Sequence, residues 1–236
     1  MVESARFLAQ KIIEQEAKAT KVFLLLSGGS AIEMYTQIFA FLPAELRLNG
    51  WTVGLVDERF GPAGHENSNE TLLRDAQVIQ NFVSRGAEFI GMLLTSSTDG
   101  PTTARQISTM YQQLYEEADQ VFIWIGLGED GHTAGWLPTQ TLSEFQQLYN
   151  QQQAVVYYEV NPQNSDNPFV QRLTMSLSVL EFADQVVMYA KGANKKVVLQ
   201  KLVAGMPPAN ELPASVLLQS SQPIEILTDQ EVVSNL

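Results

Sequence analysis

The segment from Gly126 to His132 has residue types that suit a chemical site better than a routine turn. It reads Gly-Leu-Gly-Glu-Asp-Gly-His, follows the apolar run 121–125, and holds one of the two histidines of the chain. Its glycines allow positive φ angles and close approach of the backbone to a ligand. Asp130, two residues before His132, can place a carboxylate beside an imidazole, a group that titrates near neutral pH. A purely structural turn after a buried strand is the alternative that these residues leave open.

A second segment, Ser27-Gly28-Gly29-Ser30, lies between the apolar run 22–26 and a helical pattern over 31–41. Backbone amides at the start of a helix bind anions, and two glycines let a phosphate reach the main chain. Ser30 either donates its hydroxyl to such a ligand or simply caps the helix. The segment is neither a Walker A loop nor a dinucleotide fingerprint, because it lacks Gly-Lys-Ser/Thr and Gly-x-Gly-x-x-Gly.

Three cations stand out in a chain that has few. Arg59 closes an Asp57-Glu58-Arg59 run at a predicted strand end, and its planar fork suits phosphate oxygens. A buried salt-bridge network that holds the loop is the alternative for this run. For Arg172, the alternative to binding phosphate is a simple ion pair with a surface acid. Lys195 begins a predicted helix, where a cation opposes the helix dipole unless an anion is shared there.

The elements that must position these residues alternate between strand and helix patterns. Strands are predicted at 22–26, 51–56, 121–125, 155–160, 185–190 and 223–227, with a short element at 172–174. Helices are predicted at 4–18, 31–41, 102–119 and 193–204, with one more from residue 69 capped by Ser68, a solvated helix end and loop at 146–153, and a polar loop at 161–167. This alternation predicts one domain, 1–236, with a three-layer α/β/α fold and a mostly parallel, Rossmann-like sheet. Ligands bind such sheets beyond the carboxyl ends of the strands, so loops 27–30, 57–69 and 126–138 are expected to converge.

Composition excludes several function classes. With 26 acidic and 14 basic residues and a formal charge of −12, the chain lacks the basic character of nucleic-acid-binding proteins. The absence of cysteine excludes disulfides and thiol nucleophiles, and His65 has no neighbouring His with which to bind a metal. Apolar runs are far shorter than the ~20 residues of a membrane span, and the charged N-terminal segment lacks a signal-peptide core. We therefore expect a cytoplasmic protein that does not associate with membranes; its oligomeric state cannot be read from the sequence.

Taken in order, these motifs resemble those of the 6-phosphogluconolactonase family, which is related to the glucosamine-6-phosphate deaminases. The resemblance runs nearly end to end. It rests on Leu26-Ser27-Gly28-Gly29-Ser30, Val56-Asp57-Glu58-Arg59 with His65 and Ser68-Asn69, Gly126 to Ala134, Arg172-Leu173-Thr174, and Gly192-Ala193-Asn194-Lys195.

The resemblance implies hydrolysis of 6-phospho-D-glucono-1,5-lactone to 6-phosphogluconate, a step of the oxidative pentose phosphate pathway, without a metal or organic cofactor. It implies that His132 acts as general base on water and that Asp130 orients it. Backbone amides of the glycine loops are candidate donors to the oxyanion. The residues implied to bind the substrate and its 6-phosphate are Gly28, Gly29, Ser30, Asp57, Arg59, Asn69, Arg172 and Lys195.

Two other functions are alternatives to this one: a deaminase or isomerase of sugar phosphates, and a sugar-phosphate-binding protein without catalysis. Deaminases carry a catalytic glutamate where this chain has Leu137, and usually a tyrosine where it has Arg59. The chain also departs from the usual lactonase pattern at Gly135-Trp136-Leu137, where Ser-Leu-Phe is common, at Glu70, where an aromatic residue is common, and at 226–229, which lacks a tryptophan. These departures are expected to affect the pocket wall and the C-terminal packing more than His132.

Overall fold

The computed structural model describes residues 1–18, 21–95, 99–160, 170–205, 207–219 and 224–230. Its central sheet contains six strands, all paired in parallel, in the order β4-β2-β1-β5-β8-β9. The strands are β1 (Val22–Leu26), β2 (Trp51–Leu55), β4 (Glu88–Phe89), β5 (Gln120–Gly126), β8 (Gln185–Ala190) and β9 (Ile224–Thr228). Every residue of β1 and β8 is buried, as in parallel strands covered on both faces. The predicted α/β class and parallel sheet are confirmed.

A second, three-stranded sheet was not predicted. It is antiparallel, in the order β3-β7-β6, and it consists of β3 (Asp57–Arg59), β7 (Gln171–Met175) and β6 (Val155–Glu159). The run 57–59 was expected to lie in a loop after a strand, and it instead pairs with residues 172–174. The pairing joins segments more than 100 residues apart, so no local pattern announces it. The predicted polar loop 161–167 lies outside the described residues.

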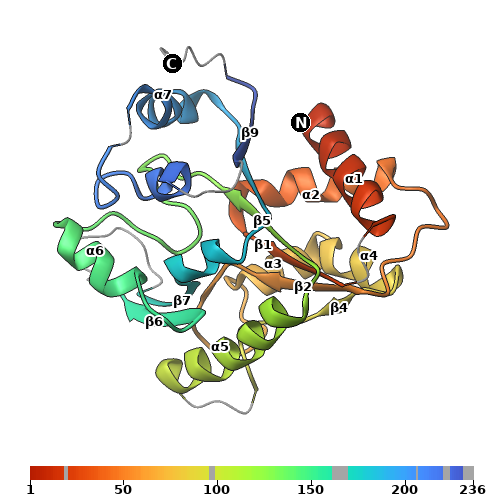
Figure 1. Cartoon of the computed structure of the whole chain (residues 1–236), viewed down its shortest axis with the longest axis horizontal. Coiled ribbons are helices and arrows are strands. Elements are labelled where there is room, and N and C mark those ends of the chain that lie inside the picture. Colours follow the sequence, from red (N-terminus) through yellow and green to blue (C-terminus); the bar gives the residue numbers. More distant parts are fainter. Residues whose placement is uncertain (19–20, 96–98, 161–169, 206, 220–223, 231–236) are drawn as a thin grey trace.

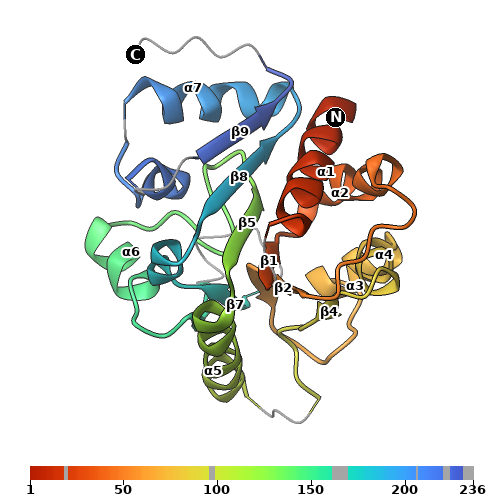
Figure 2. The same ribbon diagram turned by 45° about the vertical axis from the view of Figure 1, so that its right-hand side comes forward.

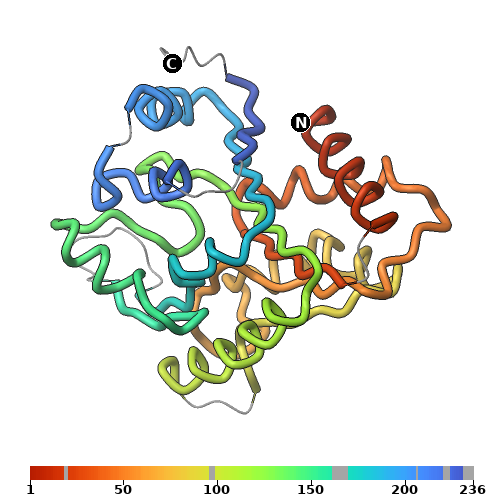
Figure 3. Tube along the Cα trace, in the orientation of Figure 1, coloured from red at the N-terminus to blue at the C-terminus, as the bar shows by residue number. Residues whose placement is uncertain are grey.

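Helices lie on both sides of the parallel sheet, which makes three layers (Figures 1 and 2). The longer helices are α1 (Val2–Glu16), α2 (Ile32–Ile38), α3 (Asn69–Asp75), α4 (Val78–Ser84), α5 (Gly100–Glu117), α6 (Leu142–Tyr149) and α7 (Lys196–Ala204). Short 3₁₀ turns precede α2 and α7, at Gly29–Ala31 and Ala193–Lys195, so both predicted helices begin later than expected. Helix α4 was not predicted. The tube in Figure 3 runs through β1, β2 and β4 on one side of β5 and through β8 and β9 on the other.

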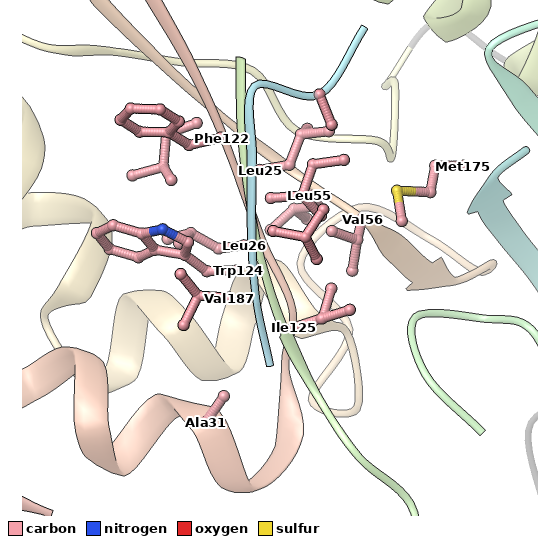
Figure 4. Close-up of a cluster of buried hydrophobic side chains, with 14 of the residues drawn as sticks. Leu25, Leu26, Ala31, Leu55, Val56, Phe122, Trp124, Ile125, Met175 and Val187 are labelled. Atoms are coloured by element: carbon pink, nitrogen blue, oxygen red, sulfur yellow. The ribbon is translucent and has the colours of Figure 1, made fainter. Parts of the chain in front are cut away.

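Aromatic side chains pack both faces of the parallel sheet. On one face Tyr35 of α2 stacks on Trp124 of β5, with ring centroids 6.3 Å apart. On the other face Tyr111 of α5 contacts Phe23 of β1 edge to face at 5.1 Å. Figure 4 shows Trp124 on one side of the strands, and Met175 from the second sheet on the other. The antiparallel sheet therefore covers part of the face that α5 also covers.

The strand register aligns the carboxyl ends of the strands that precede the predicted site loops. Leu26 at the end of β1 pairs with Leu55 of β2 and with Trp124 of β5. The last residue of β5, Gly126, pairs with Tyr189 of β8. The segments that follow these four strands consequently leave the sheet at one edge. Among the described helices, none has the combination of length and apolar character needed to cross a bilayer.

Candidate active site

One pocket of about 890 Å³ at this edge gathers every residue that the sequence singled out as a site residue. These are Gly28, Gly29, Ser30, Asp57, Arg59, Asn69, Asp130, His132, Arg172 and Lys195. The loops after β1, β2 and β5 therefore converge as predicted, and Arg172 of β7 and Lys195 after β8 join them. Within the described residues no cluster of three or more His, Cys, Asp and Glu side chains could hold a metal.

Asp130 and His132 form a close pair at the open side of the pocket. Asp130 Oδ1 accepts a hydrogen bond from the His132 backbone amide at 3.1 Å and lies 2.5 Å from His132 Nδ1. The side chains are 54% and 42% exposed, so solvent and small molecules reach them. Partial burial works against ionisation of Asp130, but the hydrogen bond and charge of His132 hold its pKa below the ordinary value. The pair is thus set up as carboxylate beside imidazole.

Glycines make room for this pair. Gly128 lies directly against it, because a Cβ atom there would overlap His132 Nδ1 and lie 2.5 Å from Asp130 Oδ1. Gly131 has a φ of 86°, which favours glycine, and a Cβ there would lie 2.8 Å from Leu212 Cγ. The amide of Gly128 donates to the His132 carbonyl at 2.7 Å and closes the turn. A side chain at Gly128 would push the imidazole out of its place.

The segment after His132 is anchored on the second sheet. The Gly135 amide donates to Thr174 Oγ1 at 3.0 Å, and Trp136 Nε1 donates to the Met175 carbonyl at 2.7 Å. Trp136 is fully buried, and neither it nor Gly135 lines the pocket. Gly135 and Trp136 therefore lie outside the pocket wall, although they belong to the segment that departs from the lactonase pattern. Leu137, one residue on, does line the pocket.

Asp57 and Arg59 alternate with Glu58 along β3, so the first two face the pocket and Glu58 does not. Arg59 is paired with Arg172 across the two strands, which brings two guanidinium groups to one wall. Asp57 is 7% exposed and Arg172 4%. Burial raises the pKa of Asp57 above its ordinary value, while the charges of Arg59 and Arg172 oppose that rise. Arg172 is therefore part of the buried pocket wall and not an exposed surface residue.

Asn69 joins the α3 side of the pocket to the loop after β1. Its Nδ2 donates to the Asp57 carbonyl at 2.9 Å, and its amide packs so closely on Gly28 that a Cβ there would overlap Oδ1. Gly29 has a φ of 65° with open space around its Cα. No described side chain caps the 3₁₀ turn or α2, so Ser30 does not serve as a cap. Its hydroxyl is exposed at the pocket.

Lys195 reaches the pocket from the turn before α7. It is 9% exposed, whereas Lys196 and Lys201 are exposed, as expected for solvated residues. Two contacts fix its loop: the Gly192 amide donates to Asp229 Oδ1 at 2.9 Å, and Asn194 Nδ2 donates to Glu129 Oε1 at 2.6 Å. A nearly buried cation at this place implies an anionic ligand or neighbour.

Glu58 is a residue of this region that the sequence did not predict to belong to the site. Its carboxylate is fully buried behind the pocket wall and accepts three backbone hydrogen bonds, from Arg59, Asn69 and Glu70. Burial raises its pKa to about 7 despite those bonds. A charged residue flanked by two pocket residues was the available signal, but only the pairing of β3 with β7 shows which way it points.

Comparisons with known proteins identify the same family that the site residues resemble. A family model described as glucosamine-6-phosphate isomerases/6-phosphogluconolactonase matches residues 1–226. A 6-phosphogluconolactonase of Helicobacter pylori (strain J99) is 30% identical over 210 residues, which is 87% of this chain and 82% of the relative. The 6-phosphogluconolactonase of Bos taurus is 28% identical over 227 residues, which is 91% of this chain and 82% of the relative.

A solved structure agrees with these sequence matches. The crystal structure of a 6-phosphogluconolactonase from Shewanella baltica OS155 has the same fold, with a TM-score of 0.73 at 24% identity, over 97% of this chain and 94% of that one. Fold and pocket define an α/β protein of the glucosamine-6-phosphate isomerase and 6-phosphogluconolactonase class. The chain belongs to the 6-phosphogluconolactonase family. The resemblance noted in the sequence is thereby confirmed.

Proposed function

We propose that the protein hydrolyses 6-phospho-D-glucono-1,5-lactone to 6-phosphogluconate. The observation that carries this proposal is the Asp130–His132 pair opening into the same pocket as Arg59, Arg172 and Lys195. Opening a lactone requires a base for water, and holding a phosphate requires cations. One pocket supplies both, and family membership supports the assignment.

His132 is the proposed general base. Its Nδ1 is engaged by Asp130, so Nε2 is the ring nitrogen that takes a proton from water. The water oxygen attacks the lactone carbonyl carbon, and a tetrahedral oxyanion forms. The bond from that carbon to the ring oxygen then breaks, and the imidazolium returns its proton to the departing oxygen. Asp130 keeps the ring oriented and stabilises the imidazolium in between.

The remaining residues are proposed to hold the substrate. Gly29, Ser30, Arg59, Arg172 and Lys195 bind the 6-phosphate, which supplies remote binding energy that positions the carbonyl carbon. The other predicted binding residues, Gly28, Asp57 and Asn69, contact the rest of the substrate. Backbone amides of the glycine loops are the proposed donors to the oxyanion.

The two alternative functions are distinguished by particular residues. A deaminase needs an acid where Leu137 stands, and Leu137 lines the pocket with a side chain that cannot exchange protons. A protein that binds sugar phosphates without catalysis has no need for a carboxylate 2.5 Å from an exposed imidazole. Both observations favour the lactonase.

We also propose that residues 1–236 work as one domain. Buried side chains from α1, from the strands and from the segment around Leu217 belong to one hydrophobic cluster. Separate domains would each have a core of their own.

The decisive experiment is an assay with freshly generated lactone. We expect acid to be released well above the spontaneous rate of lactone opening. Titration with base at constant pH measures this release. Ammonia release from glucosamine 6-phosphate would instead identify a deaminase. Binding of 6-phosphogluconate without turnover of either substrate would identify a binding protein.

A further inference from the structure

We propose that Glu58 is a positioning residue of the sugar-phosphate pocket: from behind the wall, its carboxylate holds Arg59 and Asn69 where they contact the ligand. The inference rests on the proposed function of the pocket and adds a residue that does not itself touch substrate. It assigns Glu58 an effect on ligand binding, transmitted through the backbone of its neighbours.

Glu58 accepts its hydrogen bonds from three backbone amides. Two belong to pocket residues, and the third belongs to the residue after Asn69. Oε1 accepts from the Arg59 amide and from the Asn69 amide, each at 2.7 Å, and Oε2 accepts from the Glu70 amide at 2.9 Å. The side chain has no exposed surface. One rigid group therefore joins β3 to the first turn of α3.

Capping of α3 alone does not account for this arrangement. Ser68 accepts from the Thr71 amide of this helix at 2.9 Å, and Glu58 accepts from the two preceding amides. Glu58 also accepts from the Arg59 amide, which belongs to β3 and not to the helix. Burial raises the pKa of Glu58 to about 7, so near neutral pH the ionised group lowers stability relative to an exposed one. A group that is unfavourable for stability, yet bound to three amides, is better explained by the geometry that it fixes.

The same contacts extend to the loop after β1. Asn69 Nδ2 donates to the Asp57 carbonyl at 2.9 Å, and its amide packs on Gly28. Arg59 is held at its other side as well, because its carbonyl accepts from His65 Nε2 at 2.9 Å. A shift of the α3 N-terminus would thus displace Asn69 and loosen the wall against Gly28. One carboxylate, that of Glu58, thus positions Arg59 and Asn69 directly and Gly28 through Asn69.

The test compares Glu58→Gln with Ser68→Ala. The amide of glutamine has one acceptor oxygen, so whichever way it turns it places a donor against at least one backbone donor. Ser68→Ala removes a cap from the same helix and lowers stability without touching the bonds of Glu58. Isothermal titration with 6-phosphogluconate gives Kd for each variant, lactone hydrolysis gives kcat and KM, and thermal unfolding gives Tm.

We expect Glu58→Gln to raise Kd and KM about tenfold, the equivalent of one lost hydrogen bond, with kcat changed less than about threefold. Ser68→Ala should lower Tm and leave Kd within about twofold of wild type. Equal Kd for wild type and Glu58→Gln, or a fall in kcat at unchanged KM, overturns the inference.

Two further outcomes are separable. If Glu58→Gln does not fold, Glu58→Asp is measured, and its shorter carboxylate should raise Kd; an unchanged Kd again overturns the inference. A wild-type protein that hydrolyses lactone while its Glu58 variants bind normally leaves the proposed function standing. A wild-type protein that neither binds 6-phosphogluconate nor hydrolyses the lactone overturns the proposed function and, with it, this inference.

Discussion

Two carboxylates at the pocket, Glu58 behind its wall and Asp130 in its lining, have pKa values shifted in opposite directions. Glu58 is completely buried, and burial raises its pKa to about 7. Asp130 is 54% exposed, and in spite of partial burial its bond to His132 holds its pKa below the ordinary value. Each accepts backbone hydrogen bonds at the pocket. Environment rather than residue type separates the two: one carboxylate is buried among backbone amides, and the other lies beside the imidazole that we propose as general base.

The comparison predicts where activity and where binding will respond to substitution. Asp130 and His132 are partly exposed and have room made by glycine, so we expect substitutions there to leave the fold intact. The Glu58 side is closed, and changes there act through the positions of Arg59 and Asn69. The predictions below test that division.

The largest effect is expected for His132→Ala. Loss of a general base lowers kcat by about 10²–10⁴-fold. Because the side chain is 42% exposed, Tm should change little. Acid release from fresh lactone, corrected for spontaneous opening, measures the rate. A variant as fast as wild type would remove His132 from the mechanism.

Gly128→Ala should be nearly as damaging without deleting any functional group. Its Cβ would overlap His132 Nδ1, and a displacement of about 1 Å lowers kcat roughly 100-fold. Gly86→Ala is the matched control: Gly86 has a φ of 99°, and a Cβ there would overlap Asn49, but neither residue lines the pocket. The control should lose stability and keep kcat. Similar kcat values for the two variants would mean that the position of His132 is not critical.

Substitution of the cations should act on binding. Lys195→Met or Arg172→Met removes a charge-assisted contact to phosphate, so KM and the Kd of 6-phosphogluconate should rise about 30-fold. Binding of gluconate, which lacks the phosphate, should change much less. Calorimetry with both ligands measures the difference. Equal losses for both ligands would contradict a phosphate role for these residues.

The smallest effect is a pH dependence of stability. The folded-state pKa of Glu58 lies at about 7, above its ordinary 4.5, so the native state binds more protons in this window. Its contribution to stability is therefore present at low pH and is lost as pH rises, by about 2 kcal/mol between about pH 5.5 and 7.5. The free energy of unfolding in urea, measured for wild type and Glu58→Gln over this pH range, isolates the contribution of Glu58. If the two proteins lose stability in parallel over this range, Glu58 is not the group that titrates.

Much of the site was predictable from local sequence. The apolar runs 22–26, 121–125 and 185–190 predicted parallel strands, and the glycine-rich and charged segments after them predicted where a ligand would bind. The spacing of Asp130, two residues before His132, indicated that their side chains could meet, and they do. Ser68 was predicted as the cap of α3 from its type and place alone, and it is that cap.

Other features were decided only by the tertiary structure. The pairing of 57–59 with 172–174 sends Glu58 away from the pocket and brings Arg59 and Arg172 to one wall, and such a pairing has no local signature. Trp136 is buried, and the carbonyl of Met175, from a distant strand, accepts the hydrogen bond of its indole N–H. Local periodicity specifies which segments are strands and helices, since it reflects neighbours along the chain. Burial and long-range pairing reflect the sum of contacts over the whole chain, and those decided which acid lies behind the pocket wall and which lines the pocket.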